Sequence, residues 1–193
     1  MVKLTGYKKV KAAVFISGTG SNLKSLIKFS KTNRSPISID LIVSSNPKAK
    51  GLKYGKIFKI RKKIFNFDQK NQSENKILAT FKRYDIKMVL LAGFMKILSK
   101  NFITKFKGKI LNIHPSLLPK YKGLNTHQKA LDNKEKYSGC TVHIVNSKLD
   151  SGKIILQKKV KISKSETKNS LAKKILVQEH KLYPKAILKV FNL

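Results

Sequence analysis

Short runs of apolar residues recur along the chain, and each ends in a turn rich in glycine, serine or proline. Residues 12–16 (AAVFI) and 88–92 (MVLLA) are continuous in apolar side chains. Such runs are typical of strands that are buried on both faces, whereas a half-exposed strand alternates apolar with polar residues. We therefore predict interior strands at both places, with 88–92 at the centre of the sheet because it is the more apolar.

Helical spacing and turn residues predict the remaining elements. Pro47 can begin a helix, which should end near Tyr54 because Gly55 follows. In the last helix we expect Pro184 to kink or restart the chain, with Leu171, Ile175, Val177 and Leu182 facing inward. The other expected helices are 23–29, 73–84, 101–106, 127–133 and 166–191; the other expected strands are 37–43, 56–60, 109–113, 140–145 and 154–160, and residues 62–71 are expected to be irregular.

A glycine-rich turn, GTGSN at residues 18–22, lies between the first strand and a helix. Glycines let the backbone approach a ligand, and the free amides at a helix N-terminus attract anions. Leu23 stands where a dinucleotide fingerprint has its third glycine, and the Gly-x-x-x-x-Gly-Lys pattern is absent. The turn therefore favours a single phosphate monoester. The alternative is an ordinary tight turn with Ser21 or Asn22 as the N-cap.

Asn112 and His114 end the strand expected at 109–113, immediately before Pro115. Proline removes the next ladder donor, so His114 should lie at the mouth of the strand. Residues two apart on a strand project to the same side, and ligands of open α/β sheets bind beyond the carboxyl ends of strands. An amide donor and an imidazole there suit a reaction that places negative charge on an oxygen and moves a proton. Alternatively, both side chains satisfy loop backbone groups.

The turn at 148–152 (KLDSG) joins two expected strands, which should be antiparallel neighbours because the connection is short. Asp150, one of 9 acidic residues in the chain, lies in this turn. Asp-Ser-Gly is a common turn sequence, so Asp150 could serve the turn alone. Alternatively, its carboxylate lies beside His114, raises the pKa of the imidazole from about 6.5 and makes it a general acid near neutral pH.

The chain has 193 residues, which fits one domain or at most two small ones, and a formal charge of +34 from 43 basic and 9 acidic residues. Nearly all the basic residues are lysines spread along the chain, and the only arginines are Arg34, Arg61 and Arg83. Arginine is the residue type that usually binds phosphates and bases with two hydrogen bonds. This distribution favours attraction of small anionic substrates. A nucleic-acid-binding protein without catalytic activity is the alternative, and it depends on charge alone.

The single cysteine, Cys140, excludes an internal disulfide and a cysteine-rich metal site, and the 4 histidines without paired spacing argue against a metal ion. No apolar run approaches the ~18 residues of a membrane span. The basic N-terminus has no apolar segment followed by a cleavage site. We expect a cytoplasmic protein with a short solvated extension at residues 1–11 and one domain at residues 12–193.

Six segments, spread over nearly the whole chain, resemble the folate-dependent formyltransferases. The long central segment together with Asp-Ser-Gly is highly specific for this family, and the GSN turn with the KYxGLxTH wording is similar to its glycinamide ribonucleotide branch. The segments are ISGTGSNL (16–23), VLLAGFMKILS (89–99), LNIHPSLLPKYKGLNTHQKAL (111–131), TVHIV (141–145), LDSGKIILQ (149–157) and QEHKLYP (178–184).

The resemblance implies an α/β fold: a single-domain, open, mostly parallel, Rossmann-like sheet of about seven strands flanked by helices. It also implies transfer of a formyl group from 10-formyltetrahydrofolate to the amine of glycinamide ribonucleotide in de novo purine biosynthesis. The implied enzyme uses no metal, and it is a monomer or a homodimer.

The resemblance further implies a role for individual residues. Lys70 stands where the family often has an arginine, which leaves its contact with folate open. His127 and His143 are expected to line the pocket or to pack, not to act as the acid. The implied catalytic residues are Asn112, His114 and Asp150; those for glycinamide ribonucleotide are Gly20, Ser21 and Asn22 at its phosphate, with Glu179; those for folate are Lys70, Met95, Lys96, Ile97, Leu98 and Asn112.

In the implied reaction the amine attacks the formyl carbon directly and a tetrahedral species forms. Asn112 and protonated His114 would donate to its negatively charged oxygen. Asp150 would keep His114 charged and help to pass the amine proton, through water, to the departing folate nitrogen. No residue is expected to be acylated.

Two enzymes that share the central motif are the alternatives within this chemistry. Methionyl-tRNA formyltransferase carries a C-terminal RNA-binding domain, and formyltetrahydrofolate hydrolase usually carries an N-terminal regulatory domain. This sequence ends just after its last expected helix and begins shortly before its first expected strand. We therefore favour the glycinamide ribonucleotide branch.

Overall fold

The computed structural model describes residues 8–193 and contains a 7-stranded sheet in the order β3-β2-β1-β4-β5-β6-β7. The pairs β1–β2, β1–β4 and β2–β3 are parallel, and β6–β7 is antiparallel. The predicted fold class, an open and mostly parallel α/β sheet flanked by helices, is confirmed. The chain divides between Leu111 and Asn112 into two compact units.

The expected N-terminal extension, residues 1–11, lies mostly outside the described residues, and β1 begins at Val10. Within residues 8–193 no helix is both long and apolar enough to cross a membrane.

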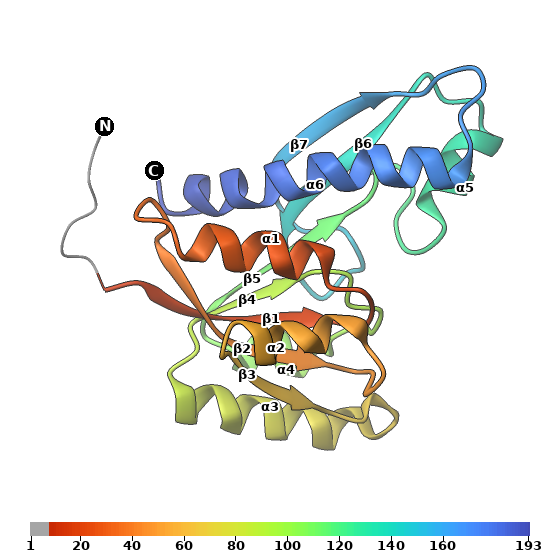
Figure 1. Cartoon of the computed structure of the whole chain (residues 1–193). Coiled ribbons are helices and arrows are strands. Elements are labelled where there is room, and N and C mark those ends of the chain that lie inside the picture. The colour runs from red at the N-terminus through yellow and green to blue at the C-terminus, as the bar shows by residue number, and fades with distance from the viewer. Residues whose placement is uncertain (1–7) are drawn as a thin grey trace. The chain divides into compact units, whose positions relative to one another are not determined.

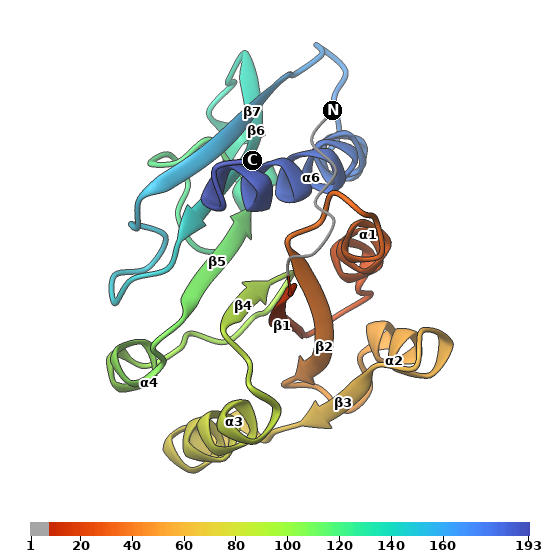
Figure 2. The ribbon, with the colours of Figure 1, turned by 90° about the vertical axis from the view of Figure 1, so that its left-hand side faces the viewer.

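The first unit is built around the buried strand β1 (Val10–Ile16), which lies between its parallel neighbours β2 (Ile37–Ser44) and β4 (Met88–Leu91). Every side chain from Ala12 to Ile16 is fully buried, as the continuous apolar run predicts. Figure 2 shows α1 and α2 on one side of these strands and α3 and α4 on the other. The helices of this unit are α1 (Ser21–Ser30), η1 (Lys50–Leu52), α2 (Lys53–Ile57), η2 (Phe67–Gln69), α3 (Lys70–Tyr84) and α4 (Lys100–Lys105).

The sequence prediction was wrong between residues 53 and 71. The expected strand at 56–60 overlaps α2, and the segment expected to be irregular contains β3 (Arg61–Ile64) and the start of α3. All four side chains of β3 are exposed at the sheet edge, so the strand lacks the apolar pattern by which strands are predicted. Gly55 does not end a helix but lies within α2, where a Cβ would come within 3.1 Å of the Ile60 carbonyl oxygen.

The second unit contains a hairpin of β6 (Tyr137–Ile144) and β7 (Ile154–Lys161), antiparallel as predicted from their short connection. The helix α6 (Lys168–Val190) packs along this hairpin, and the short helix α5 (Thr126–Asp132) contacts both α6 and β6 (Figure 1). The strand β5 (Lys109–His114) leads into this unit.

The last helix departs from expectation at two positions. It does not restart at Pro184 but is continuous through it, although proline lacks the amide that would donate to the preceding turn. Leu182, Tyr183 and Ile187 near this position are buried, and such packing, not local propensity, supplies most of the stability of a helix in a protein. Val177, expected to face inward, is 49% exposed.

Candidate active site

The glycine-rich turn of the first unit connects β1 to α1. Gly20 is the N-cap of α1 and adopts a left-handed conformation with φ 75°. A Cβ on Gly20 would lie 2.7 Å from the Cα of Gly51, so two backbones pack directly against each other here. The N-cap assignment in the alternative, Ser21 or Asn22, is therefore wrong: both belong to the first turn of the helix, and the cap has no side chain to occupy the helix amides. That the turn binds an anion stays a prediction.

Ser17, just before this turn, joins three loops of the first unit. Its hydroxyl accepts a hydrogen bond from the Met95 amide at 2.9 Å, which leaves its proton for the hydroxyl of Ser45 at 2.8 Å. The side chain of Asn46 donates to the Ser17 carbonyl at 3.2 Å. The segment that was predicted to contact folate is thus attached to the end of β1 by a neutral network.

The residues predicted for folate differ in their surroundings. Met95 and Ile97 are 62% and 61% exposed, which suits the wall of an apolar binding site, whereas Leu98 is 6% exposed and packs in the core. Lys96 is exposed, with its ammonium 3.8 Å from Asp68 Oδ1. Lys70 is half-buried and is the first residue of α3, not part of a loop.

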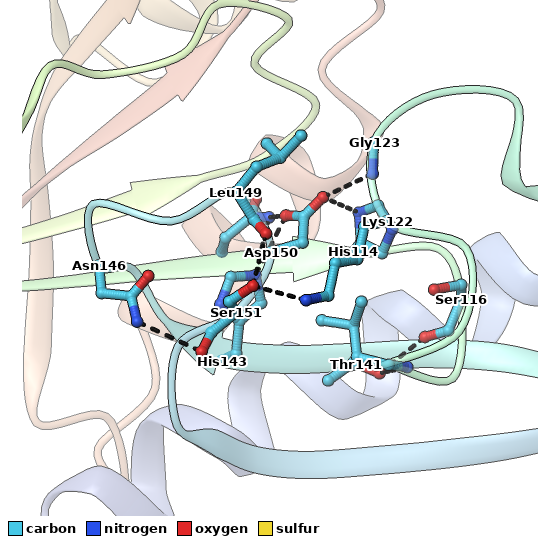
Figure 3. A network of polar contacts seen from close by, with 12 residues as sticks. His114, Ser116, Lys122, Gly123, Thr141, His143, Asn146, Leu149, Asp150 and Ser151 are labelled. Atoms are coloured by element: carbon cyan, nitrogen blue, oxygen red, sulfur yellow. Dashed lines mark hydrogen bonds and ion pairs between the residues drawn. The ribbon is translucent and has the colours of Figure 1, made fainter.

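In the second unit, Asn112, His114 and Asp150 lie together. His114 is the last residue of β5, and Asp150 comes from the loop between β6 and β7, where it has φ 44° (Figure 3). Asp150 Oδ2 lies 3.4 Å from His114 Nδ1, and Asn112 Nδ2 donates to Asp150 Oδ1 at 3.4 Å. The side chains of His114 and Asp150 are only 7% and 8% exposed. The Gly123 amide donates to Asp150 Oδ2 at 2.9 Å and fixes the carboxylate.

The second nitrogen of His114 determines which tautomer is present. Nε2 lies 2.9 Å from the backbone carbonyl oxygen of Tyr121. A carbonyl oxygen only accepts hydrogen bonds, so Nε2 carries a proton. Nδ1 then faces the Asp150 carboxylate, and a second proton there would give an imidazolium whose two N–H groups both have acceptors.

Burial lowers the pKa of His114, and this outweighs the Tyr121 carbonyl and the Asp150 carboxylate, which both raise the pKa. The charge of His143 lowers the pKa further. The expected upward effect of Asp150 is therefore present, but the prediction of a raised pKa for His114 is wrong in its net direction.

Asp150 shows the opposite balance. Burial alone raises the pKa of its carboxyl, but the contacts with His143 and the Gly123 amide, together with the charge of His114, hold the pKa below its usual value. Asp150 is therefore an anion at neutral pH inside a largely buried cluster.

His143 belongs to the same cluster. The sequence predicted only that this residue lines the pocket or packs, not that it contacts Asn112 and Asp150. Its Nε2 lies 3.1 Å from Asn112 Nδ2 and 3.5 Å from Asp150 Oδ1, and its Nδ1 donates to the Ile144 carbonyl at 3.0 Å. The roles of the Tyr121 carbonyl and the Gly123 amide were also missed, since backbone groups leave no signal in residue type. For His143 a signal existed: it lies near the end of a strand that leads directly into the loop of Asp150.

The other candidate residues of this unit lie on helices. Glu179 of α6 is buried near Cys140: burial raises the pKa of the Cys140 thiol to about 12, and the charge of Glu179 acts in the same direction. His127 of α5 has its pKa lowered by burial and by the charges of Lys168 and His114. In residues 8–193 no three His, Cys, Asp or Glu side chains are grouped as metal ligands.

Comparison with known proteins identifies relatives over most of the chain. A family model described as formyl transferase matches residues 10–187. Phosphoribosylglycinamide formyltransferase of Escherichia coli is 38% identical over 177 residues, which cover 90% of this chain and 84% of that protein. The human trifunctional purine biosynthetic protein adenosine-3 is 39% identical over 183 residues, and the matched region spans 93% of this chain but only 18% of that protein.

A solved structure has the same fold. Phosphoribosylglycinamide formyltransferase from Brucella melitensis superposes with a TM-score of 0.89 at 40% sequence identity, and the match covers 95% of this chain and 96% of that chain.

Proposed function

The chain belongs to the formyl transferase family, and we propose that it transfers the formyl group of 10-formyltetrahydrofolate to the amine of glycinamide ribonucleotide, a step of purine biosynthesis. The observation that carries this proposal is the buried cluster of Asn112, His114 and Asp150 at the end of β5. The names of the Escherichia coli and Brucella melitensis relatives support the choice of substrates.

The proposed reaction is a direct transfer. The amine of glycinamide ribonucleotide attacks the formyl carbon, and the carbonyl oxygen becomes negatively charged in a tetrahedral intermediate. Asn112 Nδ2 and His114 Nδ1 donate to this oxygen. Each lies 3.4 Å from an oxygen of Asp150, a long distance for a hydrogen bond that a better acceptor can replace. The other N–H of Asn112 Nδ2 can keep its contact with His143 Nε2 at 3.1 Å. One such donor is worth ~2.7–4 kcal/mol of transition-state stabilisation.

Asp150 affects both the protonation of His114 and the proton transfer of the reaction. Its carboxylate raises the pKa of His114 against the effect of burial and so increases the fraction of imidazolium that can donate. The collapse of the intermediate requires that the amine loses a proton and that the departing folate nitrogen gains one. We assign this transfer to Asp150 through water, because no other carboxylate contacts His114 within residues 8–193.

Each substrate is assigned to residues by the resemblance, with support from local geometry. Gly20, Ser21 and Asn22 bind the phosphate of glycinamide ribonucleotide, and the glycine N-cap of α1 supports this role because it leaves helix amides available to an anion. Glu179 contributes to binding the same substrate. The exposed apolar side chains of Met95 and Ile97 support a folate wall. The remaining folate residues are Lys70, Lys96, Asn112 and Leu98, the last through its backbone since its side chain is buried.

The proposal extends to the setting of the enzyme. Residues 12–193 form its one catalytic domain, it acts in the cytoplasm as a monomer or a homodimer, and it uses no metal and binds no nucleic acid as a dedicated partner.

The decisive experiment follows the absorbance change on folate release with the purified chain and 10-formyltetrahydrofolate. Release that requires glycinamide ribonucleotide supports the proposal. Release with water alone identifies a hydrolase, and release that requires methionyl-tRNA identifies the tRNA-specific activity; either result would reject the proposed acceptor. No release with any acceptor, in a protein that is folded by circular dichroism, would reject the enzyme class.

A further inference from the structure

The acceptor of the His114 Nε2 proton is a backbone carbonyl in a loop, so its position depends on what holds that loop. This acceptor is the carbonyl of Tyr121, at 2.9 Å. Tyr121 itself has φ 55°, a left-handed conformation that is uncommon for an aromatic residue. Such a conformation persists when neighbouring contacts stabilise it.

The side chain of Glu135 supplies such a contact. Its Oε1 accepts a hydrogen bond from the Tyr121 hydroxyl at 2.8 Å and an ion-pair contact from the Lys120 ammonium at 2.6 Å. Glu135 is in turn fixed just after α5, because its amide donates to the carbonyl of Ala130 at 3.0 Å. The two residues at the turn are thus attached to the end of a helix.

The preceding part of the same loop is attached by a different set of contacts. Thr141 Oγ1 donates to the Ser116 carbonyl at 2.6 Å (Figure 3) and accepts from the Leu118 amide at 3.1 Å. Gln157 Nε2 donates to the Leu118 carbonyl at 2.8 Å. These contacts from β6 and β7 hold the loop at residues 116 and 118, whereas Glu135 holds it at residue 121, where the catalytic histidine is bound.

We propose that Glu135 is a positioning residue for His114: by binding the Tyr121 hydroxyl it holds the Tyr121 carbonyl against His114 Nε2, which directs the other nitrogen, Nδ1, toward Asp150 and the substrate. The consequence for catalysis rests on the proposed function. The positioning itself does not, because it concerns two hydrogen bonds that are present without substrate.

The positions of the charged groups around His114 allow the effect of Glu135 on His114 to be measured separately. Asp150 contacts His114 directly, and His143 and His127 interact with its charge. Glu135 faces Lys120 and Tyr121 instead. A change at Glu135 therefore reaches His114 through the Tyr121 carbonyl. Since that carbonyl raises the pKa of His114, a displaced carbonyl should lower it.

The test uses the substitutions Glu135→Ala and Tyr121→Phe in the full chain. Both side chains line a hollow of about 630 Å³, so truncating them creates no buried cavity and the variants should fold. In NMR spectra without substrate, we expect the Nε2 proton of His114 to exchange faster and the imidazole to titrate at lower pH than in the parent. The kcat should fall about tenfold with KM unchanged, within the range that a small displacement of a catalytic group causes.

Matched controls define the outcome. Lys120→Gln removes the other partner of Glu135. The Lys120 side chain is 62% exposed, so its ion pair contributes little and the His114 signals and kcat should stay unchanged. Glu135→Gln keeps an oxygen acceptor for the Tyr121 hydroxyl, so its His114 signals and its kcat should be close to those of the parent. The double variant Glu135→Ala/Tyr121→Phe should be no worse than either single variant, because both delete the same contact.

His114 signals that stay unchanged in Glu135→Ala, or that change equally in Lys120→Gln, would overturn the positioning role. If the parent chain transfers no formyl group, the proposed function fails, while the NMR titration still decides whether Glu135 positions His114. If Glu135→Ala is unfolded by circular dichroism, Tyr121→Phe is compared with Glu135→Gln and Lys120→Gln instead. Loss of the His114 Nε2 proton signal in Tyr121→Phe, with parent-like signals in the other two, supports the role. An Nε2 proton signal that is retained in Tyr121→Phe overturns it.

Discussion

The turn after β1 and the cluster after β5 differ in the groups that build them. The turn relies on backbone: a left-handed Gly20, a close approach of two glycines and the amides of α1, beside the neutral hydroxyls of Ser17 and Ser45. The cluster relies on ionisable side chains of three separate segments, since His114 ends β5, His143 lies near the end of β6, and Asp150 belongs to the following loop.

This difference predicts how each region responds to change. A backbone anion site is set by local conformation, so a substitution there should change substrate affinity and leave the chemical step intact. Charges in a buried cluster influence one another strongly because little water screens them. A substitution there should alter the rate and its pH dependence together.

The largest effect is expected for His114→Ala. Removal of the proton donor should lower kcat by ~10²-fold or more and change the KM of glycinamide ribonucleotide little. Steady-state kinetics at saturating folate measures both values. A kcat close to that of the parent would remove His114 from the mechanism and with it the contrast between the two regions.

Asp150→Asn should follow, with a loss of tens of fold in kcat at neutral pH. Asparagine tolerates the left-handed conformation of this position, so the loop should be retained. Because the carboxylate raises the pKa of His114, its removal should lower that pKa, and the decline of kcat with rising pH should begin at lower pH than in the parent. A pH–rate profile that does not move would reduce Asp150 to a residue of the turn.

Gly20→Ala should affect binding by about tenfold, since a strained residue costs on the order of 1–3 kcal/mol. The positive φ and the 2.7 Å approach to Gly51 both oppose a side chain. We expect a higher KM for glycinamide ribonucleotide with kcat retained. Gly18→Ala is the matched control in the same turn, because a Cβ there meets no atom within 4 Å. Equal kinetics for the two variants would contradict a backbone-defined phosphate site.

The smallest effect concerns stability. Burial lowers the pKa of His114, His127 and His180 in the folded chain below the ordinary histidine value of about 6.5. The unfolded chain then binds more protons, so the free energy of unfolding should decrease as pH falls below about 6.5. Asp150 does not oppose this trend, because its lowered pKa keeps its contribution intact until far more acidic pH. Urea denaturation at pH 7 and pH 5 measures this decrease in the free energy of unfolding, and His114→Gln should make the decrease smaller. Equal urea midpoints at the two pH values would contradict the prediction.

The two regions also differ in how far the sequence predicted them. The turn is contiguous, so its strand, glycines and helix could be interpreted together. The helix begins at Ser21, two residues before its expected start, and the cap is Gly20, not a residue of the alternative. The side of the strand shared by Asn112 and His114 followed from the two-residue period. That Asp150 approaches His114 depends on the packing of β6 and β7, which a local pattern does not contain. The residues offered this contact only as an alternative to a plain turn, and the family resemblance favoured it.

The errors have physical causes as well. The exposed strand β3 carries no apolar period, and α2 contains the glycine that was expected to end it. The net pKa direction of His114 depends on how much water the folded chain removes from the ring, a quantity that residue types alone do not provide.

The basic character of β3 has a consequence for association. A strand at a sheet border offers its free backbone groups to strands of other molecules, and proteins commonly oppose this with charge. Arg61, Lys62 and Lys63 on β3 would bring like charges face to face if two copies joined border to border. This repulsion weakens as ionic strength rises, so concentrated salt, not dilution, should promote ordered aggregation through this strand.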